Sequence, residues 1–470
     1  MTLNRRTLLR AMAVSGASLA LGTRFGEGLA NAAAPAAGTG FSAIPASALS
    51  RYGGIDVRAM IIKFFYTDGL VPQLPMFQKT TGINVAINQF GVSEEFTKAD
   101  FELASGTGSY EVVSLYMGSF QRAVRAGWIV PLDLYIDNPD LTNKPALDVP
   151  DFFAGGLNAF RYQGKQYGLP TIIGLQAMYV RSDLLAKAGI KTPPRTFAEL
   201  LAAAKELHNG NAVAGIAMRA VRGRGQNVWS NLQFLYGYGA PLVKNFPTDM
   251  HPNVDSAQAI DAVTYLTNIL GNYSLPDVGS VQMEDAVTNF NEGRVAILIE
   301  GVPQIGRIVD PKQSKVVDVI DVAVVPGGPA GTFPPVDAHA WVIPASSKHK
   351  EAAWLFANWA TSRDVQLQAG LQGPDSVPTR KYVTQVPAFR QKWSYAKGDW
   401  LRTYEKTLTL RSSYYGSPTY FLPIPEWPEF EDRLSVALSE ALTKAKSPAQ
   451  AMRDAQADLT DLMKKGGYFK

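Results

Sequence analysis

Hydrophobic residues follow the spacing of a strand and the spacing of a helix in turn along most of the chain. Residues 57–66 form a run rich in β-branched and aromatic side chains, as a buried strand does. After a turn predicted at Asp68-Gly69, apolar residues recur at helical spacing over 70–77, and Gly82 stands where a helix commonly ends. Apolar and polar residues then alternate over 83–87. The pattern predicts a strand, a helix and a second strand.

The same succession continues toward the C-terminus. A helix is predicted from Ser93 to the glycines at 106 and 108. Further strands are predicted over 112–116, 214–218, 295–299, 319–325 and 340–343, and further helices over 256–270, 284–290 and 350–360. Strands separated by helices throughout a chain are typical of the α/β class, which we therefore predict.

Capping residues define several helix ends. Thr196 and Glu199 have the spacing of a capping box, which opens a helix that continues to Leu207. Near the C-terminus, an apolar stripe over 430–442 predicts one helix, and the sequence Ser-Pro-Ala-Gln at 447–450 opens another that ends at Gly466-Gly467. No repeat of fixed period and no long linker interrupts residues 55–470.

The N-terminus has the architecture of an export signal. Arg5, Arg6 and Arg10 precede an uncharged stretch over 11–23, and small residues follow around Ala32. The adjacent arginines and the leucines after them resemble a twin-arginine signal. About 13 residues are too few to span a hydrocarbon layer of about 30 Å. We therefore expect a signal peptide over 1–32 that is cleaved, a flexible tether over 33–54, and a periplasmic location.

Composition and charge exclude several classes of protein. A length of 470 residues predicts two to four domains, and 46% hydrophobic residues supply substantial cores. Residues 1–32 hold four basic residues and one acidic residue, so the rest of the chain has 41 basic and 40 acidic residues. This balance does not indicate the clustered basic residues that are typical of nucleic-acid-binding proteins. The chain has no cysteine and only four scattered histidines, so we expect no disulfide, no metal site and no cofactor.

Several segments together carry a resemblance to a known family. They are ASGTGSYEVV at 104–113, AGWIVPLD at 126–133, YQGKQYGLP at 162–170, residues 179–200, FNEGRVA at 290–296 with Gly301, and SSKHKEAAWLF at 346–356. In these segments the chain resembles the extracellular solute-binding proteins of ABC importers, family 1, a group that includes maltose-binding and many polyol-binding proteins. The resemblance covers essentially the whole chain after the leader.

The resemblance implies a two-lobe periplasmic binding protein fold of type II. Each lobe would be a central sheet flanked by helices, and three crossings would join the lobes near Gly168–Ile172, Val325–Pro334 and Gly373–Lys381. Lobe 1 would take 55–168 and 335–375, and lobe 2 would take 172–325 and 382–470. The function implied is capture of a sugar, oligosaccharide or polyol between the lobes by a monomeric chain, and its delivery to an ABC permease of the inner membrane.

Carbohydrate capture needs flat apolar faces for C–H groups and directional polar groups for hydroxyls. Loops at strand ends are the place to look for both. From these loops we take nine candidate ligand-binding residues: Tyr66, Asp68, Tyr116, Thr171, Trp229, Glu300, Asp337, Trp341 and Arg380. The family also implies a further stacking ring from Tyr414-Tyr415 or Trp427.

Each candidate has a purely structural alternative. The aromatic residues could serve as core packing, because Tyr and Trp are commonly buried for their bulk. Asp68 could cap the helix that follows it, and Asp337, Glu300 and Arg380 could form ion pairs within one lobe. We expect His339 to be a structural loop residue.

Other functions remain open at this point. An exported glycoside hydrolase would need two carboxyl groups roughly 5–10 Å apart, which Asp337 and Glu300 could supply. Twin-arginine export also suggests a redox protein, but the composition offers few attachment points for a cofactor. The chain shows no Gly-x-Ser-x-Gly elbow, Walker loop or dinucleotide fingerprint. A third alternative keeps the fold and binds a phosphorylated, peptidic or other non-carbohydrate solute. We expect a binding protein rather than an enzyme.

Overall fold

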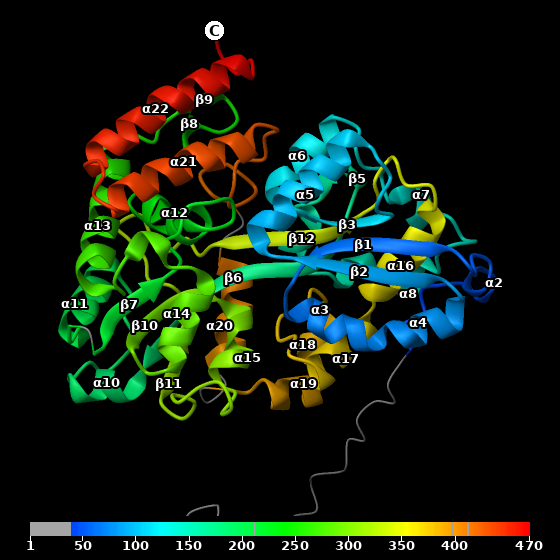
Figure 1. Cartoon of the computed structure of the whole chain (residues 1–470), viewed down its shortest axis with the longest axis horizontal. Helices are drawn as coiled ribbons and strands as arrows, with labels where there is room; N and C mark the ends of the chain where they lie inside the picture. The colour runs from blue at the N-terminus through cyan, green and yellow to red at the C-terminus, as the bar shows by residue number, and fades with distance from the viewer. Residues whose placement is uncertain (1–38, 211, 396–398, 411–412) are drawn as a thin grey trace, which may run out of the picture. The chain divides into compact units, whose positions relative to one another are not determined.

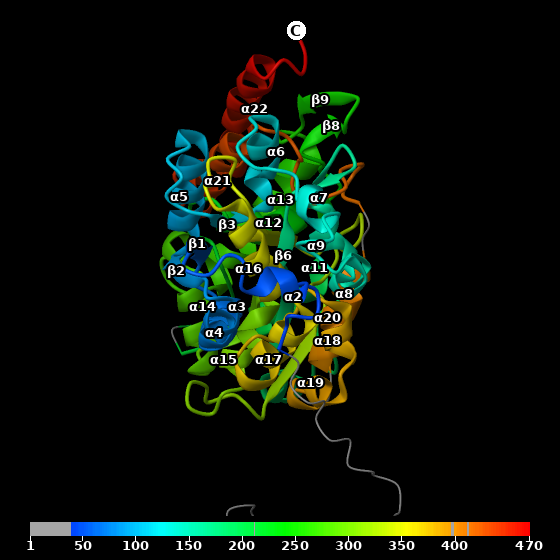
Figure 2. The same cartoon turned by 90° about the vertical axis from the view of Figure 1, so that its right-hand side faces the viewer.

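The computed structural model describes residues 39–470 except 211, 396–398 and 411–412 (Figure 1). The predicted export signal, residues 1–32, lies outside the described residues. None of the described helices is both long enough and apolar enough to cross a membrane. Helices cover both faces of a central mixed sheet, as predicted for the α/β class (Figures 1 and 2).

Four strands build the first part of this sheet, in the order β2-β1-β3-β12. The strands are β1 (Asp56–Ile62), β2 (Asn84–Phe90), β3 (Val112–Tyr116) and β12 (Val336–Val342). β1 is parallel to β2 and β3, and β12 is antiparallel to β3. We call these strands and the helices packed on them the first lobe.

One long strand continues the sheet into the second part. β6 (Leu169–Arg181) pairs with β12 up to Leu175 and with β10 (Val295–Gly301) from Gln176 onward. β7 (Ala214–Met218) and β11 (Ile320–Ala323) complete the second part by pairing with β10 and β6. We call β7, β10, β11 and their helices the second lobe. The sequence predicts that the chain crosses between the lobes near Gly168–Ile172. In the structure, β6 exchanges its partner strand β12 for β10 between Leu175 and Gln176.

The helices of the first lobe lie on both faces of its strands. In Figure 1, α5 and α6 lie above these strands, and α3 and α4 lie below them. The helices are α2 (Ala46–Leu49), α3 (Phe65–Leu70), η1 (Val71–Gln73), α4 (Leu74–Thr81), α5 (Val92–Ser105), α6 (Met117–Arg125), α7 (Asp133–Ile136), α8 (Lys144–Leu147), η2 (Val149–Asp151), α9 (Ala154–Asn158), α16 (Lys350–Ala360) and α17 (Arg363–Gln372). A hairpin, β4 (Arg161–Tyr162) and β5 (Lys165–Gln166), precedes β6.

The second lobe carries the longest helices. They are α10 (Ser182–Lys187), α11 (Phe197–Leu207), α12 (Asn227–Gly237), α13 (Ala257–Tyr273), η3 (Val278–Ser280), α14 (Met283–Asn291), η4 (Val302–Gln304), α15 (Ile305–Ile308), α20 (Asp399–Leu410), α21 (Trp427–Leu442) and α22 (Pro448–Lys465). A hairpin of β8 (Val243–Asn245) and β9 (Asp249–Pro252) packs beside α22. α18 (Lys381–Gln385) and α19 (Pro387–Lys392) pack on α17.

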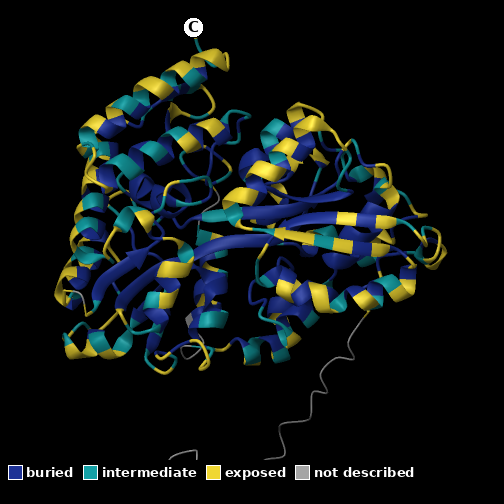
Figure 3. Cartoon of the chain, viewed as in Figure 1, coloured by how far each residue is buried: buried dark blue, intermediate teal, exposed yellow. Residues whose placement is uncertain are grey.

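Burial follows this layered arrangement. The strands of the sheet are largely buried, and the exposed residues lie on the outward faces of the helices (Figure 3). β10 is buried over its whole length, and β6 is buried up to its last residue, because helices cover both faces of these strands.

The capping signals of the sequence are present in the structure. The Thr196 hydroxyl accepts the Glu199 amide at 3.1 Å, and the Glu199 carboxylate accepts the Arg195 amide at 2.7 Å. Ser447 caps α22 through the Gln450 amide. One local expectation is wrong: Asp68 and Gly69 lie within α3 rather than in a turn.

The predicted flexible tether over 33–54 is wrong for its described part, residues 39–54. Phe41 is buried, and its ring stacks on those of Phe77 and Trp359 at 6.1 Å each. The Gly40 amide donates to Asp364, and the Trp359 indole donates to the Thr39 carbonyl. The apolar residues of this segment fix it against the first lobe, next to α16 (Figure 2).

Candidate functional site

A small cavity of about 50 Å³ lies between the two lobes. The first lobe contributes Ile62, Phe64, Val92, Phe96, Asp337 and His339; the second lobe contributes Arg219, Gly225, Trp229, Met283, Gly301, Pro303 and Gln304; and the shared strand β6 contributes Ile172 and Gly174. A larger hollow between α10 and α11 is lined by residues of the second lobe alone. The inter-lobe cavity is therefore the candidate site.

Two aromatic side chains line this cavity, one from each lobe. Trp229 lies in the first turn of α12, after β7, and is 4% exposed. Its indole nitrogen has no hydrogen-bond partner among the described residues. Phe96 comes from α5, and its ring stacks on that of Tyr116 with centroids 4.2 Å apart and an interplanar angle of 7°. The cavity thus has an apolar ring on each side.

A buried ion pair lies beside Trp229. Arg219 follows β7 directly, and its Nη2 lies 2.7 Å from Oε1 of Glu300, while Nε donates to Oε2 at 3.3 Å. Glu300 Oε1 also accepts the Gly301 amide. The Arg219 guanidinium lies 4.8 Å from the centre of the Trp229 ring. Glu300 therefore forms an ion pair within its own lobe, which was the structural alternative for this residue.

Asp337 brings a carboxyl group into the cavity from β12. It lies opposite Gly174 of β6, where an added methyl group would come within 1.7 Å of the Asp337 Oδ1 atom. Burial raises the pKa of Asp337 to about 7, opposed by Arg219 and by the Gly174 amide. Near neutral pH this side chain can therefore accept or donate a hydrogen bond.

Two further polar groups line the cavity. His339 lies in strand β12 rather than in a loop, and its Nδ1 atom has no partner among the described residues. Burial lowers the pKa of His339 to about 3, so the ring is neutral at physiological pH. Gln304 donates to the sulfur of Met283, while its Oε1 atom has no partner within the described part of the chain. Both residues offer neutral hydrogen-bonding atoms.

Tyr66 and Trp341, predicted to bind ligand, belong to the core of the first lobe. The Tyr66 hydroxyl donates to the Ala360 carbonyl at 3.0 Å and accepts from the Trp341 indole at 3.2 Å. Burial raises the Tyr66 pKa well above its usual value. The polar groups of both side chains are thus hydrogen-bonded within the first lobe. Both side chains are buried, and neither lines the cavity.

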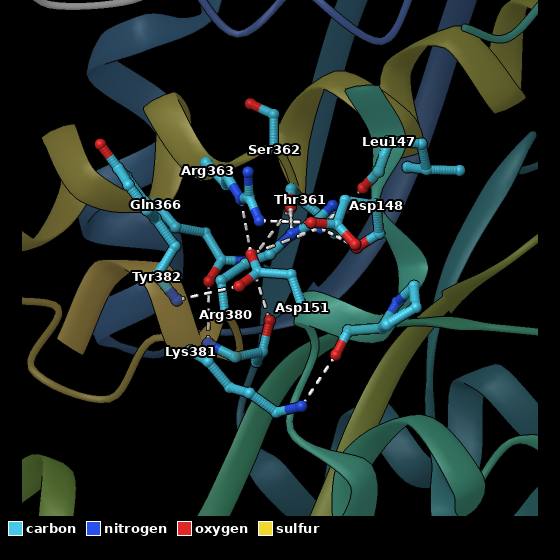
Figure 4. A network of polar contacts seen from close by, with 12 residues as sticks. Leu147, Asp148, Asp151, Thr361, Ser362, Arg363, Gln366, Arg380, Lys381 and Tyr382 are labelled. Atoms are coloured by element: carbon cyan, nitrogen blue, oxygen red, sulfur yellow. Dashed lines mark hydrogen bonds and ion pairs between the residues drawn. The ribbon is translucent and has the colours of Figure 1, made fainter. Parts of the chain in front are cut away.

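Arg380 is also placed away from the cavity. It is 1% exposed, and it donates to the carbonyls of Thr361, Leu147 and Asp148 at 2.8–3.0 Å (Figure 4). Its guanidinium lies 3.7 Å from the centre of the Phe152 ring. Burial lowers the pKa of Arg380 to about 9. This residue anchors the segment before α18 to the first lobe and does not line the cavity.

The other predicted residues lie near the cavity wall or away from it. Tyr116 stacks behind Phe96, and Thr171 is buried in β6 next to Ile172. Asp68 is exposed on α3. None of the three lines the cavity, so of the nine predicted residues Trp229 and Asp337 do so.

The aromatic residues of the last segment make hydrogen bonds and ring contacts within the fold. The Tyr414 hydroxyl donates to the Pro334 carbonyl, and the Tyr415 hydroxyl donates to the Tyr236 carbonyl. The Tyr420 hydroxyl donates a hydrogen bond to the backbone carbonyl of Trp229 at 3.1 Å. Trp427 packs on Phe430. These residues do not line the cavity, and Tyr420 supports Trp229 from behind.

The sequence interpretation missed Arg219, Phe96 and Gln304. Arg219 carried a usable signal, because it directly follows the predicted strand 214–218. Phe96 reads as an ordinary apolar position of an amphipathic helix. Among the described residues, no group of three or more His, Asp or Glu side chains is placed to hold a metal ion.

Residues 63–367 match the family model described as bacterial extracellular solute-binding protein. A mannitol-binding protein of Pseudomonas aeruginosa is 26% identical over 387 residues, which are 78% of this chain and 84% of that protein. A solved ABC transporter solute-binding protein from Agrobacterium radiobacter, in complex with ribitol, matches with a TM-score of 0.77 at 21% identity and covers 87% of this chain and 99% of that one. Another from Agrobacterium vitis, with bound D-mannitol, matches with a TM-score of 0.76 at 23% identity, over 89% and 100% of the two chains. These structures confirm the two-lobe fold.

Proposed function

Because the chain belongs to the bacterial extracellular solute-binding protein family, we propose that it captures a neutral polyol or sugar in the cavity between its lobes and delivers it to an ABC permease. One observation carries the proposal. The cavity presents Phe96 and Trp229 on its two sides, with Asp337, His339 and Gln304 as hydrogen-bonding groups between them. Flat apolar faces suit C–H surfaces, and such polar groups suit hydroxyls.

The charge of the cavity supports a neutral solute. Among its described lining residues Arg219 is the one cationic side chain, and Glu300 neutralises it within 2.7 Å. An anionic solute such as a sugar phosphate would therefore meet no uncompensated cation. Asp337 would disfavour a further carboxylate. The similar proteins hold mannitol and ribitol, which are uncharged linear polyols.

The mechanism we propose is a population shift between open and closed forms. The solute contacts groups of both lobes only when the lobes are together, so binding stabilises the closed form by its differential affinity. We further propose that residues 1–32 are a cleaved twin-arginine signal, that the mature chain is a periplasmic monomer, and that the closed form docks on the permease.

Calorimetric titration with D-mannitol, ribitol, erythritol, maltose and D-glucose 6-phosphate tests the proposal. We expect saturable binding of at least one neutral compound and none of the phosphate ester. Chromatography of the recovered compound distinguishes binding from hydrolysis, because a glycoside hydrolase would return maltose as glucose. Failure of every neutral compound to bind, or turnover of maltose, would overturn the proposal.

A further inference from the structure

The loop between β7 and α12, residues 219–226, reaches from the second lobe to the first. Arg224 lies at its tip, between Gly223 and Gly225, whose φ angles of +138° and +69° belong to the region that favours glycine. This backbone conformation projects the Arg224 side chain away from its own lobe. We call residues 219–226 the bridging loop.

Arg224 makes its shortest polar contacts with the first lobe. Its Nη1 atom lies 2.8 Å from Asp100 Oδ2 on α5, and its Nη2 atom donates to Ser119 Oγ on α6 at 2.8 Å. The guanidinium also lies 5.7 Å from the centre of the Phe96 ring. The side chains of Arg224 and Asp100 are only 17% and 18% exposed, so water screens this ion pair weakly.

The same loop is held firmly on its own side. The Gly225 amide donates to Glu431 Oε1 at 2.8 Å, and the Gly223 amide donates to Ser435 Oγ at 2.9 Å, both on α21. Arg219 Nη1 donates to the Gly225 carbonyl at 2.9 Å. Arg219 and Gly225 both line the cavity, so the bridging loop borders the space that a solute would occupy.

We propose that Arg224 is a positioning residue that locks the lobes together over the bound solute without touching it. Arg224 does not line the cavity, whereas its neighbour Gly225 does. The contacts with Asp100 and Ser119 exist only while the lobes are closed, so they add to the stability of the closed form and slow release of the solute. This inference rests on the proposed function.

A second inter-lobe ion pair is more exposed to solvent than that of Arg224 and is therefore weaker. Arg122 of α6 donates to the Pro425 carbonyl at 3.0 Å and pairs with Glu429 of α21. The Glu429 side chain is 48% exposed, and exposed ion pairs contribute little. Arg224 is therefore the contact whose loss should change affinity.

Arg222→Ala is the matched control for Arg224→Ala. Arg222 lies in the same loop, but it faces Asp432 of its own lobe at 3.8 Å and is 56% exposed. With D-mannitol as the probe, or the neutral compound that binds most tightly in the titration above, we expect Arg224→Ala to raise Kd about tenfold, mainly through a faster koff. Arg222→Ala should leave Kd within about twofold of the parent value. Equal Kd values for the two variants would overturn the proposal.

A double-mutant cycle of Arg224→Ala with Asp100→Ala isolates the pair. Loss of the inter-lobe contact predicts that the double variant binds no more weakly than Arg224→Ala alone. Additive losses would contradict direct coupling between the two residues. If Arg224→Ala does not fold, Asp100→Asn and Ser119→Ala carry the test from the other lobe, and unchanged koff in both variants would overturn the proposal.

A distance measurement separates this proposal from the proposed function. The chain has no native cysteine, so spin labels at Leu134→Cys on α7 and Ala457→Cys on α22, both exposed positions, report the spacing of the lobes. In the absence of solute, we expect Arg224→Ala to lengthen the mean label distance relative to Arg222→Ala. This result would support the lock even if no compound of the panel binds. Identical distance distributions, with and without the probe, would overturn it.

Discussion

Gly174 and Asp337 face each other across two paired strands, and the absence of a side chain at 174 leaves room for the carboxyl group. Any larger residue at 174 would displace Asp337 from the cavity. Asp337 is also close to half protonated near neutral pH, since burial raises its pKa to about 7. Its carboxyl group can therefore donate a hydrogen bond to a hydroxyl or accept one from it.

Replacing Asp337 by Asn should weaken polyol binding by about 1.5–3 kcal/mol, because a charge-assisted hydrogen bond is lost while the shape is kept. Asp68→Asn is the matched control, since Asp68 is exposed on α3 and does not line the cavity. Calorimetric titration of both variants with D-mannitol checks this. A similar affinity for the two variants would remove Asp337 from the binding site.

Sequence patterns alone cannot separate core aromatics from ligand-facing ones. Tyr66 lies in α3 and Trp341 near the end of β12, and the Trp341 indole donates to the Tyr66 hydroxyl inside the first lobe. Trp229, in contrast, lines the cavity. The difference lies in tertiary partners far apart in the chain, which local spacing does not contain. Arg219 was missed although it follows a predicted strand, because its pairing with Glu300 spans 81 positions.

At the scale of elements, the segment entering α18 is fixed by a buried cation. Arg380 satisfies three carbonyl groups of the first lobe and lies 3.7 Å from Asp151, which also pairs with Arg363 (Figure 4). The Arg380 side chain thus ties the segment before α18 to the end of α16 and to α8. These contacts predict a role for Arg380 in structural stability.

Arg380→Met should lower the free energy of unfolding by about 3 kcal/mol, because it leaves buried acceptors unpaired. The affinity of the folded fraction for D-mannitol should stay within about twofold of the parent value. Lys381→Met, at the neighbouring exposed position, should change stability by less than about 0.5 kcal/mol. Urea unfolding and calorimetric titration measure the two quantities. A loss of affinity without a loss of stability would instead support a ligand contact for Arg380.

Elements with strong local signals were predicted closely, and those without such signals were not. The strands β3 and β7 and the helix α11 have the predicted bounds, because period and capping are local properties. β6 was missed as a strand, since Pro170, Gly174 and Gln176 interrupt its apolar residues. The segment 39–54 was predicted to be mobile from its small residues, although Phe41 and its apolar neighbours pack it in place.

At the scale of the whole molecule, three buried carboxyl groups make stability depend on pH. Burial raises the pKa of Asp337, Asp375 and Glu431 to about 7 each. In the unfolded chain these groups titrate near pH 4. Between pH 4 and 7 the folded chain therefore holds more protons at these sites, so their contribution to stability is complete below pH 4 and declines as pH rises to 7.

Asp375→Asn isolates one of these contributions outside the cavity. An amide keeps an acceptor for the Val377 amide, which Asp375 Oδ1 accepts at 3.2 Å, but it does not titrate. We expect the loss of stability between pH 5 and 8 to be smaller in this variant than in the parent chain. Urea unfolding at both pH values checks this. An unchanged pH dependence would show that Asp375 titrates normally in the folded state.

The continuity of β6 limits how the two lobes can come apart during unfolding. Its residues up to Leu175 complete one half of the sheet, and those from Gln176 complete the other. If either half of the sheet unfolds, the shared strand β6 is also disturbed in the other half. The loss of one lobe therefore destabilises the other. A fragment containing one lobe alone would lack part of its own sheet. The protein should therefore unfold in a single cooperative transition despite its two-lobed architecture.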